Sequence, residues 1–196
     1  MRSALTIASL ALLLAACGQG GEGNNAAAPD ASGNAPAASA PAATGTLGSL
    51  LAADPRFTGL VRAAGMTRVL EGKEPYTVLA PTSQAFDALP AGTLERLQAP
   101  AGKAELTALL RHHILPGTIM VADLTRAVEA RKGKATLTTM TGEPLTVTRD
   151  GQSLRIAGSS GTGARLVGNE QTASNGVIHQ IDAVLPAARQ TGTTTD

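Results

Sequence analysis

Aromatic residues are scarce in this chain of 196 residues, which contains two Phe, one Tyr and no Trp. Any hydrophobic core must therefore be built from Leu, Val, Ile and Ala, the other residue types that are most often buried. Sugar binding on aromatic platforms is poorly supported by three such residues. The composition indicates a small aliphatic domain.

Cysteine and excess charge are also nearly absent. Cys17 is the only cysteine, so an internal disulfide is excluded. The formal net charge is +1, and Arg2 supplies that excess. A balanced charge gives no reason to expect a nucleic-acid partner, because such partners require a basic surface.

Catalytic motifs are missing as well. The sequence contains no Gly-x-Ser-x-Gly turn and no phosphate-binding Gly-x-x-x-x-Gly-Lys loop. Adjacent histidines on a helix diverge by about 100°, so His112 and His113 are not expected to bind one metal ion together. His113 and His179 could meet in a core, where two structural histidines or a metal site would explain them equally well. We expect no enzyme activity, no metal and no cofactor.

The N-terminus has the features of an export signal. Residues 1–16 carry one basic residue and a short apolar run. Leu14-Ala15-Ala16-Cys17 resembles the bacterial lipoprotein processing box, in which the thiol takes the lipid. An ordinary cleaved signal with a chance cysteine is the alternative. The resemblance predicts a lipidated Cys17, with a palmitate-type acyl anchor.

The segments on either side of the periodic region lack bulky apolar residues. Residues 17–45 are rich in Gly, Ala, Asn, Pro and Ser, and predict a flexible tether with a reach of about 30 Å. Residues 187–196 predict a disordered tail. The folded domain is therefore expected over residues 46–186.

Helical patterns come first in that domain and strand patterns later, which predicts an α+β fold. Asp54-Pro55 is a helix start, and Gly65 is placed to end that helix. Further helices are expected over 47–51, 66–70 and 103–114, and residues 121–130 are either helical or irregular. Strands are expected over 76–80, 135–140, 145–149, 153–156, 164–167 and 177–185.

Three motifs occur in order along this region. Thr77–Phe86, Leu109–Gly117 and Asn175–Pro186 resemble the signature blocks of fasciclin-like domains. The resemblance covers residues 46–186 and implies a β-wedge: two small sheets packed at an angle, with several short helices along one side. It also implies a role in cell adhesion or matrix contact. Many relatives carry Tyr at the position of His112, so a role of that Tyr-His pair does not carry over.

Several polar residues of these motifs are assigned to folding. Thr82 is expected to cap a helix, and Asn175 begins an Asn-Gly turn. His113 shares the apolar face of its helix with Leu109, and His179 lies on the apolar face of its strand. We therefore predict that these four residues form a structural polar set.

A contact surface is predicted around the middle motif. Arg111 and His112 leave the apolar helix face and are expected near solvent, followed by the turn at Pro116 and Gly117. Ordinary surface is the alternative interpretation. The predicted function is a lipid-anchored envelope module, at the outer membrane, that binds a protein, matrix or glycan partner. The alternative is a periplasmic domain with a metal-binding or hydrolytic role for His113 and His179.

Overall fold

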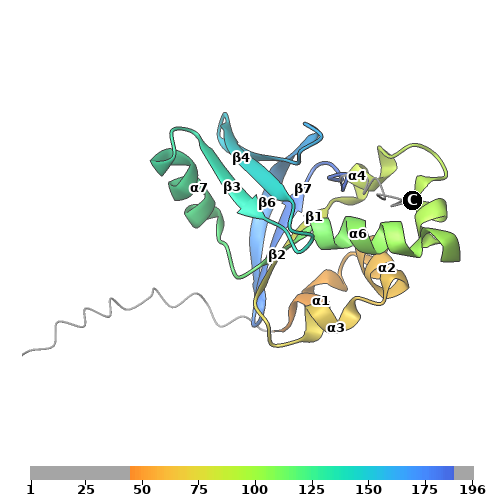
Figure 1. The fold of residues 1–196 in the computed structure, drawn as a ribbon. Helices are drawn as coiled ribbons and strands as arrows, with labels where there is room; N and C mark the ends of the chain where they lie inside the picture. The colour runs from red at the N-terminus through yellow and green to blue at the C-terminus, as the bar shows by residue number, and fades with distance from the viewer. Residues whose placement is uncertain (1–44, 188–196) are drawn as a thin grey trace, which may run out of the picture. The chain divides into compact units, whose positions relative to one another are not determined.

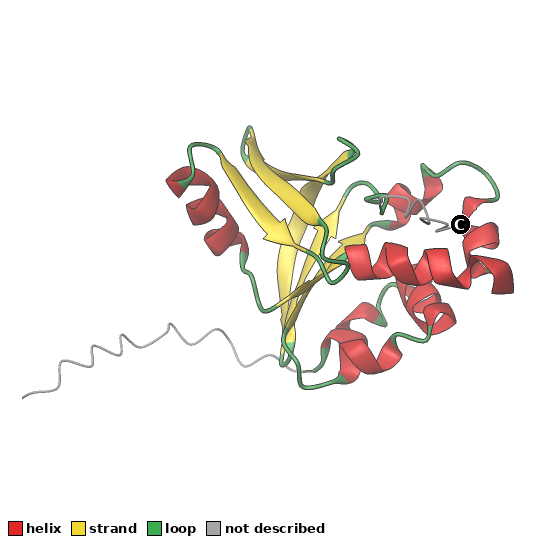
Figure 2. Ribbon diagram, in the orientation of Figure 1, coloured by secondary structure: helices red, strands yellow, loops and turns green. Residues whose placement is uncertain are grey.

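The computed structural model describes residues 45–187. The predicted signal (1–16), the tether (17–45) except its last residue, and the tail from residue 188 lie outside this part. The described chain folds into seven α-helices, one 3-10 turn and seven strands (Figures 1 and 2). The elements in order are α1 Leu47–Leu51, α2 Pro55–Ala64, α3 Thr67–Glu71, β1 Tyr76–Pro81, α4 Ser83–Asp87, α5 Thr93–Gln98, η1 Pro100–Gly102, α6 Lys103–His112, β2 Ile114–Pro116, α7 Val121–Ala130, β3 Lys134–Thr138, β4 Pro144–Asp150, β5 Ser153–Ala157, β6 Gly163–Ala173 and β7 Gly176–Ile181.

Local capping explains where the early helices begin and end. The Asp54 carboxylate accepts bonds from the backbone N–H groups of Arg56 and Phe57 at the start of α2. Gly65 ends that helix in the left-handed conformation, with φ of 76°. The hydroxyl of Thr82 accepts from the N–H of Ala85 at the start of α4. These predicted caps are confirmed.

The strands form a single sheet, and the expected division into two sheets is wrong. The strand order is β2-β1-β7-β6-β5-β4-β3. The long strand β6 belongs to both halves, because its first residues pair with β5 and most of its length pairs with β7. A register shift between Val167 and Gln171 bends β6. The two halves of the expected wedge are therefore continuous through one strand.

The sheet curls until its two edge strands approach each other. β2 and β3 are the edges, and the backbone N–H of Met140, just after β3, donates to the carbonyl of Ile114 in β2 over 2.8 Å. The sheet is mixed, since β1 and β7 run parallel and the other pairs are antiparallel. The result is a nearly closed, barrel-like sheet.

The helices cover more than one side of this sheet. The segments from α1 to α6 gather on one side, whereas α7 lies on the other, against β3 and β4 (Figure 1). One buried cluster joins the helical side to β1, with Phe57 and Leu106 among its members. A second cluster lies beneath α7 and includes Leu124 and Val147. The expectation of helices along one side alone is therefore corrected.

Several element bounds differ from those that the sequence predicts. The helix expected over 103–114 ends at His112, because Ile114 starts β2 beside β1. The strand expected over 177–185 ends at Ile181. Strand β7 lies between β1 and β6 in the middle of the sheet, and both of its faces are buried except at the partly exposed Gln180. The turn before β7 is formed by Ser174 and Asn175, and Gly176 is the first residue of the strand.

Helix α7 confirms the helical alternative for residues 121–130. Within residues 45–187, none of the helices has the length and apolar character needed to cross a membrane.

Candidate functional site: the histidines and the middle motif

His113 is a structural residue whose two ring nitrogens are both used. It directly follows α6, where the spacing of four residues places its Nδ1 2.8 Å from the carbonyl oxygen of Leu109. Its Nε2 accepts a bond of 3.1 Å from the backbone N–H of Leu185. Complete burial lowers the pKa of His113 to about 4. The bond to Leu109 raises this pKa, but by less than burial lowers it. The ring is therefore neutral at pH 7, with the proton on Nδ1.

His179 uses only one of its ring nitrogens within the described chain. Its Nε2 donates to the carbonyl oxygen of Ile119 over 2.7 Å. Its Nδ1 is buried without a hydrogen-bond partner among residues 45–187, and lies 4.0 Å from Oε2 of Glu170. Burial lowers the pKa of His179, while the Ile119 bond and the Glu170 carboxylate oppose this shift. His179 therefore presents an unused acceptor toward a carboxylate.

These contacts count against a metal site shared by His113 and His179. A metal would need a free nitrogen lone pair on each ring, but the only lone pair of neutral His113 accepts from Leu185. Among the described residues, no cluster of three or more His, Cys, Asp and Glu side chains is arranged to hold a metal ion. A catalytic or metal-binding role for the pair would cost His113 its structural bonds.

Asn175 joins three segments that lie far apart in the sequence. Its Oδ1 accepts a bond of 2.7 Å from the N–H of Leu47. Its Nδ2 donates to the carbonyl oxygens of Leu70, at 2.9 Å, and Gly72, at 2.6 Å. Thr82, His113 and His179 likewise bond to backbone groups, so each of the four residues of the predicted structural polar set makes a hydrogen bond within the described chain.

His112 is buried, so the expectation that it lies near solvent is wrong. Its side chain is 1% exposed, and its Nδ1 lies 2.9 Å from Oε2 of Glu143, which makes an ion pair only when the ring is protonated. Burial lowers the pKa of His112, and the Glu143 carboxylate opposes this shift. His112 faces away from Leu106 and Leu110 on α6, but Glu143 of the β3–β4 hairpin and Gly158 after β5 lie against its ring. The sequence around His112 contains no signal for this cover, because Glu143 lies 31 residues away.

The other residues of the predicted surface occupy two separate places. Arg111 is exposed, and its guanidinium donates to the carbonyl oxygen of Met140 in the β3–β4 hairpin over 3.2 Å. Pro116 is exposed at the far end of β2, opposite Tyr76. The N–H of Gly117 donates to the carbonyl oxygen of Pro75 over 2.9 Å. The predicted surface is thus divided between the two ends of β2.

Taken together, this geometry defines an α+β domain in which the polar residues of the sequence motifs support the fold. A sequence model of the Fasciclin domain matches residues 55–187. This match covers more than half of the chain, and the chain belongs to the fasciclin domain family.

Two relatives illustrate the range of this family. The chain is 36% identical over 125 residues to protein sll1483 of Synechocystis sp., covering 64% of this chain and 62% of that protein. It is 37% identical over 127 residues to the transforming growth factor-beta-induced protein ig-h3 of Sus scrofa, covering 64% of this chain and 16% of that protein. The chain therefore spans about three fifths of the first relative and a small part of the second.

A solved structure shares the fold. It is a FAS1 domain pair from the insect cell adhesion molecule fasciclin I, which matches with a TM-score of 0.53 at 18% sequence identity. The match covers 68% of this chain and 45% of that chain. At this level of identity the similarity establishes the fold.

Proposed function

We propose that this protein is a lipid-anchored module of the bacterial cell envelope that binds a protein, matrix or glycan partner and catalyses no reaction. One observation carries this proposal: the polar residues that mark its motifs are used within the domain. His113, Asn175 and Thr82 all bond to backbone groups of their own chain. Family membership, and the shared fold of an insect cell adhesion molecule, support a role in adhesion.

The anchor in this proposal is Cys17, after removal of residues 1–16 as a signal peptide. Several acyl chains on one cysteine give stable membrane binding, whereas one chain gives only marginal binding. Residues 17–45 would then serve as the tether, and Gly18 after the cysteine, in place of Asp, is compatible with export to the outer membrane. Tethering raises the effective concentration of the domain near an envelope partner.

The contact surface in this proposal consists of exposed residues of the middle motif. Arg111 and the β3–β4 hairpin that it contacts form one candidate surface, and Pro116 with Gly117 forms another. His112 does not belong to either surface as a contact residue, because it is buried.

Cell fractionation tests the anchor. The wild-type protein is expected to remain with membranes after a high-salt wash, and Cys17→Ser is expected to release it into the soluble fraction. Ser3→Ala, outside the processing box, serves as the control and should fractionate as the wild type does. A Cys17→Ser protein that still sediments with washed membranes would contradict the lipid anchor.

A pull-down from envelope extract, with mass spectrometry of the bound material, tests binding. Arg111→Ala is expected to reduce capture of a specific partner, whereas Arg68→Ala, which removes another exposed arginine from α3, is expected to leave it unchanged. Equal capture by both variants would show that the surface around Arg111 does not contact the partner. A zinc- or serine-dependent hydrolase activity in the purified protein would overturn the non-catalytic proposal.

A further inference from the structure

A small cavity lies between α7 and the bent part of the sheet, in a region that the adhesion proposal does not use. Its volume is about 170 Å³. Apolar side chains of α7 and of strands β5 and β6 form part of its wall, and polar side chains form the rest. The residues that matter below are Val121, Arg149, Leu154, Glu170 and His179.

Two hydrogen-bond acceptors face each other at this cavity. His179 donates through Nε2 to Ile119, so the neutral ring carries a lone pair on Nδ1. Oε2 of Glu170 lies 4.0 Å from that nitrogen and accepts a bond of 2.9 Å from the backbone N–H of Val121. The Val121 bond holds the carboxylate in place, whereas Nδ1 of His179 receives no hydrogen bond from the described residues.

A buried acceptor without a donor destabilises the folded state, because it has lost its bond to water and gained none in return. A single donor group about 2.8–2.9 Å from each atom would serve both acceptors, because the two atoms are only 4.0 Å apart. Such a group needs at least two N–H or O–H bonds that point in different directions.

The charge of the cavity favours a cation. Glu170 contributes a carboxylate, and His179 is neutral at pH 7 because burial lowers its pKa. Arg149 also lines the cavity, but its guanidinium is paired with the carboxylate of Glu129 at 2.7 Å. A positively charged donor would gain a charge-assisted bond to Glu170, roughly twice as strong as a neutral bond.

From these observations we propose that the cavity binds a small ligand through its primary ammonium group, which donates to Nδ1 of His179 and to the carboxylate of Glu170. The short carbon chain of the ligand would lie against Val121 and Leu154. The cavity volume limits the ligand to a few non-hydrogen atoms beyond the ammonium group. This site goes beyond the proposed adhesion role and does not depend on it.

Nuclear magnetic resonance titration of the full chain carrying Cys17→Ser tests the proposal with two matched probes. Ethanolamine at pH 7 carries one ammonium and one hydroxyl group, and ethylene glycol has a hydroxyl in place of the ammonium. Ethanolamine is expected to shift the Nδ1 resonance of His179 and the amide resonances around Glu170, and to saturate. Ethylene glycol is expected to bind at least about tenfold more weakly, because it lacks the charge.

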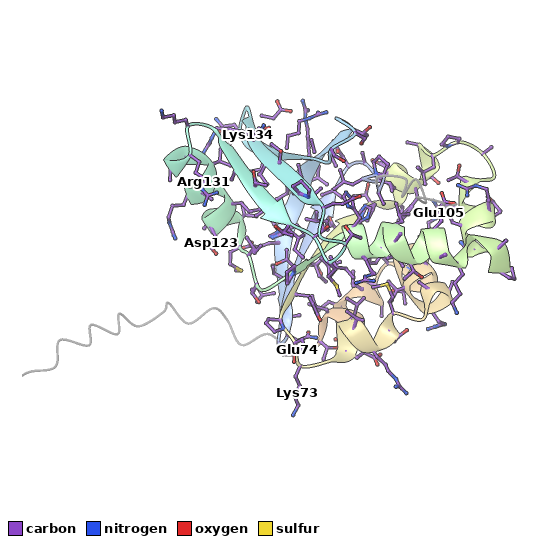
Figure 3. All side chains as sticks on the ribbon, in the orientation of Figure 1. Lys73, Glu74, Glu105, Asp123, Arg131 and Lys134 are labelled. Atoms are coloured by element: carbon purple, nitrogen blue, oxygen red, sulfur yellow. The ribbon has the colours of Figure 1, made fainter. Side chains whose placement is uncertain are left out.

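Two conservative variants locate the binding groups. His179→Gln preserves a donor for the Ile119 carbonyl and removes the Nδ1 acceptor, so it should weaken ethanolamine binding. Glu170→Gln retains an acceptor for Val121 and removes the charge, with an expected loss of about tenfold. Glu105→Gln is the matched control: Glu105 pairs with Arg96 on the helical side, away from α7, where Asp123 is labelled (Figure 3). This control should bind as the parent chain does.

Each of the following three results would overturn the proposal. Equal shifts with both probes would show that hydroxyl groups, and not ammonium, are recognised. Unchanged binding in Glu170→Gln would place the ligand elsewhere, even if His179→Gln failed to fold. An absence of shifts with either probe would show that water alone satisfies Nδ1 of His179.

Discussion

Asn175 and Leu47 are 128 residues apart in the sequence, yet the side-chain oxygen of Asn175 accepts a bond of 2.7 Å from the backbone N–H of Leu47. The same side chain holds the carbonyl oxygens of Leu70 and Gly72. One buried amide thus connects the start of α1, the end of α3 and the turn before β7.

Replacement of Asn175 by Ala should therefore destabilise the whole domain. It removes three hydrogen bonds and leaves buried backbone groups without partners, at a cost of about 3 kcal/mol in the free energy of unfolding. Urea denaturation followed by circular dichroism would measure the loss. Ser174→Ala, at the exposed neighbouring position, should change stability by less than about 0.5 kcal/mol. Similar midpoints for both variants would contradict the role of Asn175.

The connection made by Asn175 shows what a single sequence can and cannot reveal. The Asn-Gly pair predicts a turn one residue later than the Ser174-Asn175 turn of the structure, and it comes this close because it is a local signal. The three partners of the side chain depend on how distant segments pack, and no local pattern indicates them. The helix caps at Asp54 and Thr82 were predictable for the same local reason.

Long-range pairing accounts for the parts of the fold that were not predicted. β2 has only three residues and forms because β1 lies beside it, so the helical pattern of α6 was extended two residues too far. The family resemblance implies two separate sheets, whereas β6 pairs with both β5 and β7 and so joins the two halves into one sheet. The burial of His112 likewise depends on a hairpin whose Glu143 is distant in the sequence.

His113 should make the stability of the domain depend on pH. Its pKa is lowered by burial from 6.5 to about 4, so the unfolded chain binds the proton more readily than the folded chain. Its contribution to stability is therefore complete above pH 6.5, falls as the pH decreases toward 4, and changes no further below that value. Between pH 7 and pH 5 the loss should be about 2 kcal/mol.

Denaturant titrations at pH 7 and pH 5, on the wild type and on His113→Gln, would isolate this effect. The variant is expected to be less stable at pH 7, because it loses the bonds to Leu109 and Leu185, and to lose less stability on acidification. The other histidines and the carboxylates are the same in both proteins, so their contributions to the pH dependence cancel when the two proteins are compared. Parallel pH dependences would show that His113 does not titrate as proposed.

Gly176 and Gly117 offer a test of backbone crowding. Both have positive φ, 147° and 88°, respectively. A Cβ atom at Gly176 would lie 1.9 Å from the carbonyl oxygen of Tyr76, whereas a Cβ atom at Gly117 would meet nothing within 4 Å. Gly176→Ala is expected to cost more than about 3 kcal/mol or to prevent folding, because backbone must shift. Gly117→Ala should cost only about 1–2 kcal/mol of conformational strain. Thermal unfolding of the two variants would compare these costs, and equal losses would contradict the crowding at Gly176.

Arg111 and His112 are neighbours in the sequence, but their substitutions should have different effects. His112 is 1% exposed and packs beneath the β3–β4 hairpin, so His112→Ala is expected to cost about 2–4 kcal/mol through lost packing. Arg111 is exposed, so Arg111→Ala should cost less than about 1 kcal/mol, even though it loses the bond to Met140.

Denaturation and the pull-down, measured on the same preparations, would separate folding from binding. If Arg111 forms part of a contact surface, Arg111→Ala loses the partner at nearly unchanged stability, whereas His112→Ala loses it only in proportion to the unfolded fraction. A His112→Ala protein that is as stable as the wild type but fails to bind would show that this buried ring reaches the partner, and would restore His112 to the contact surface.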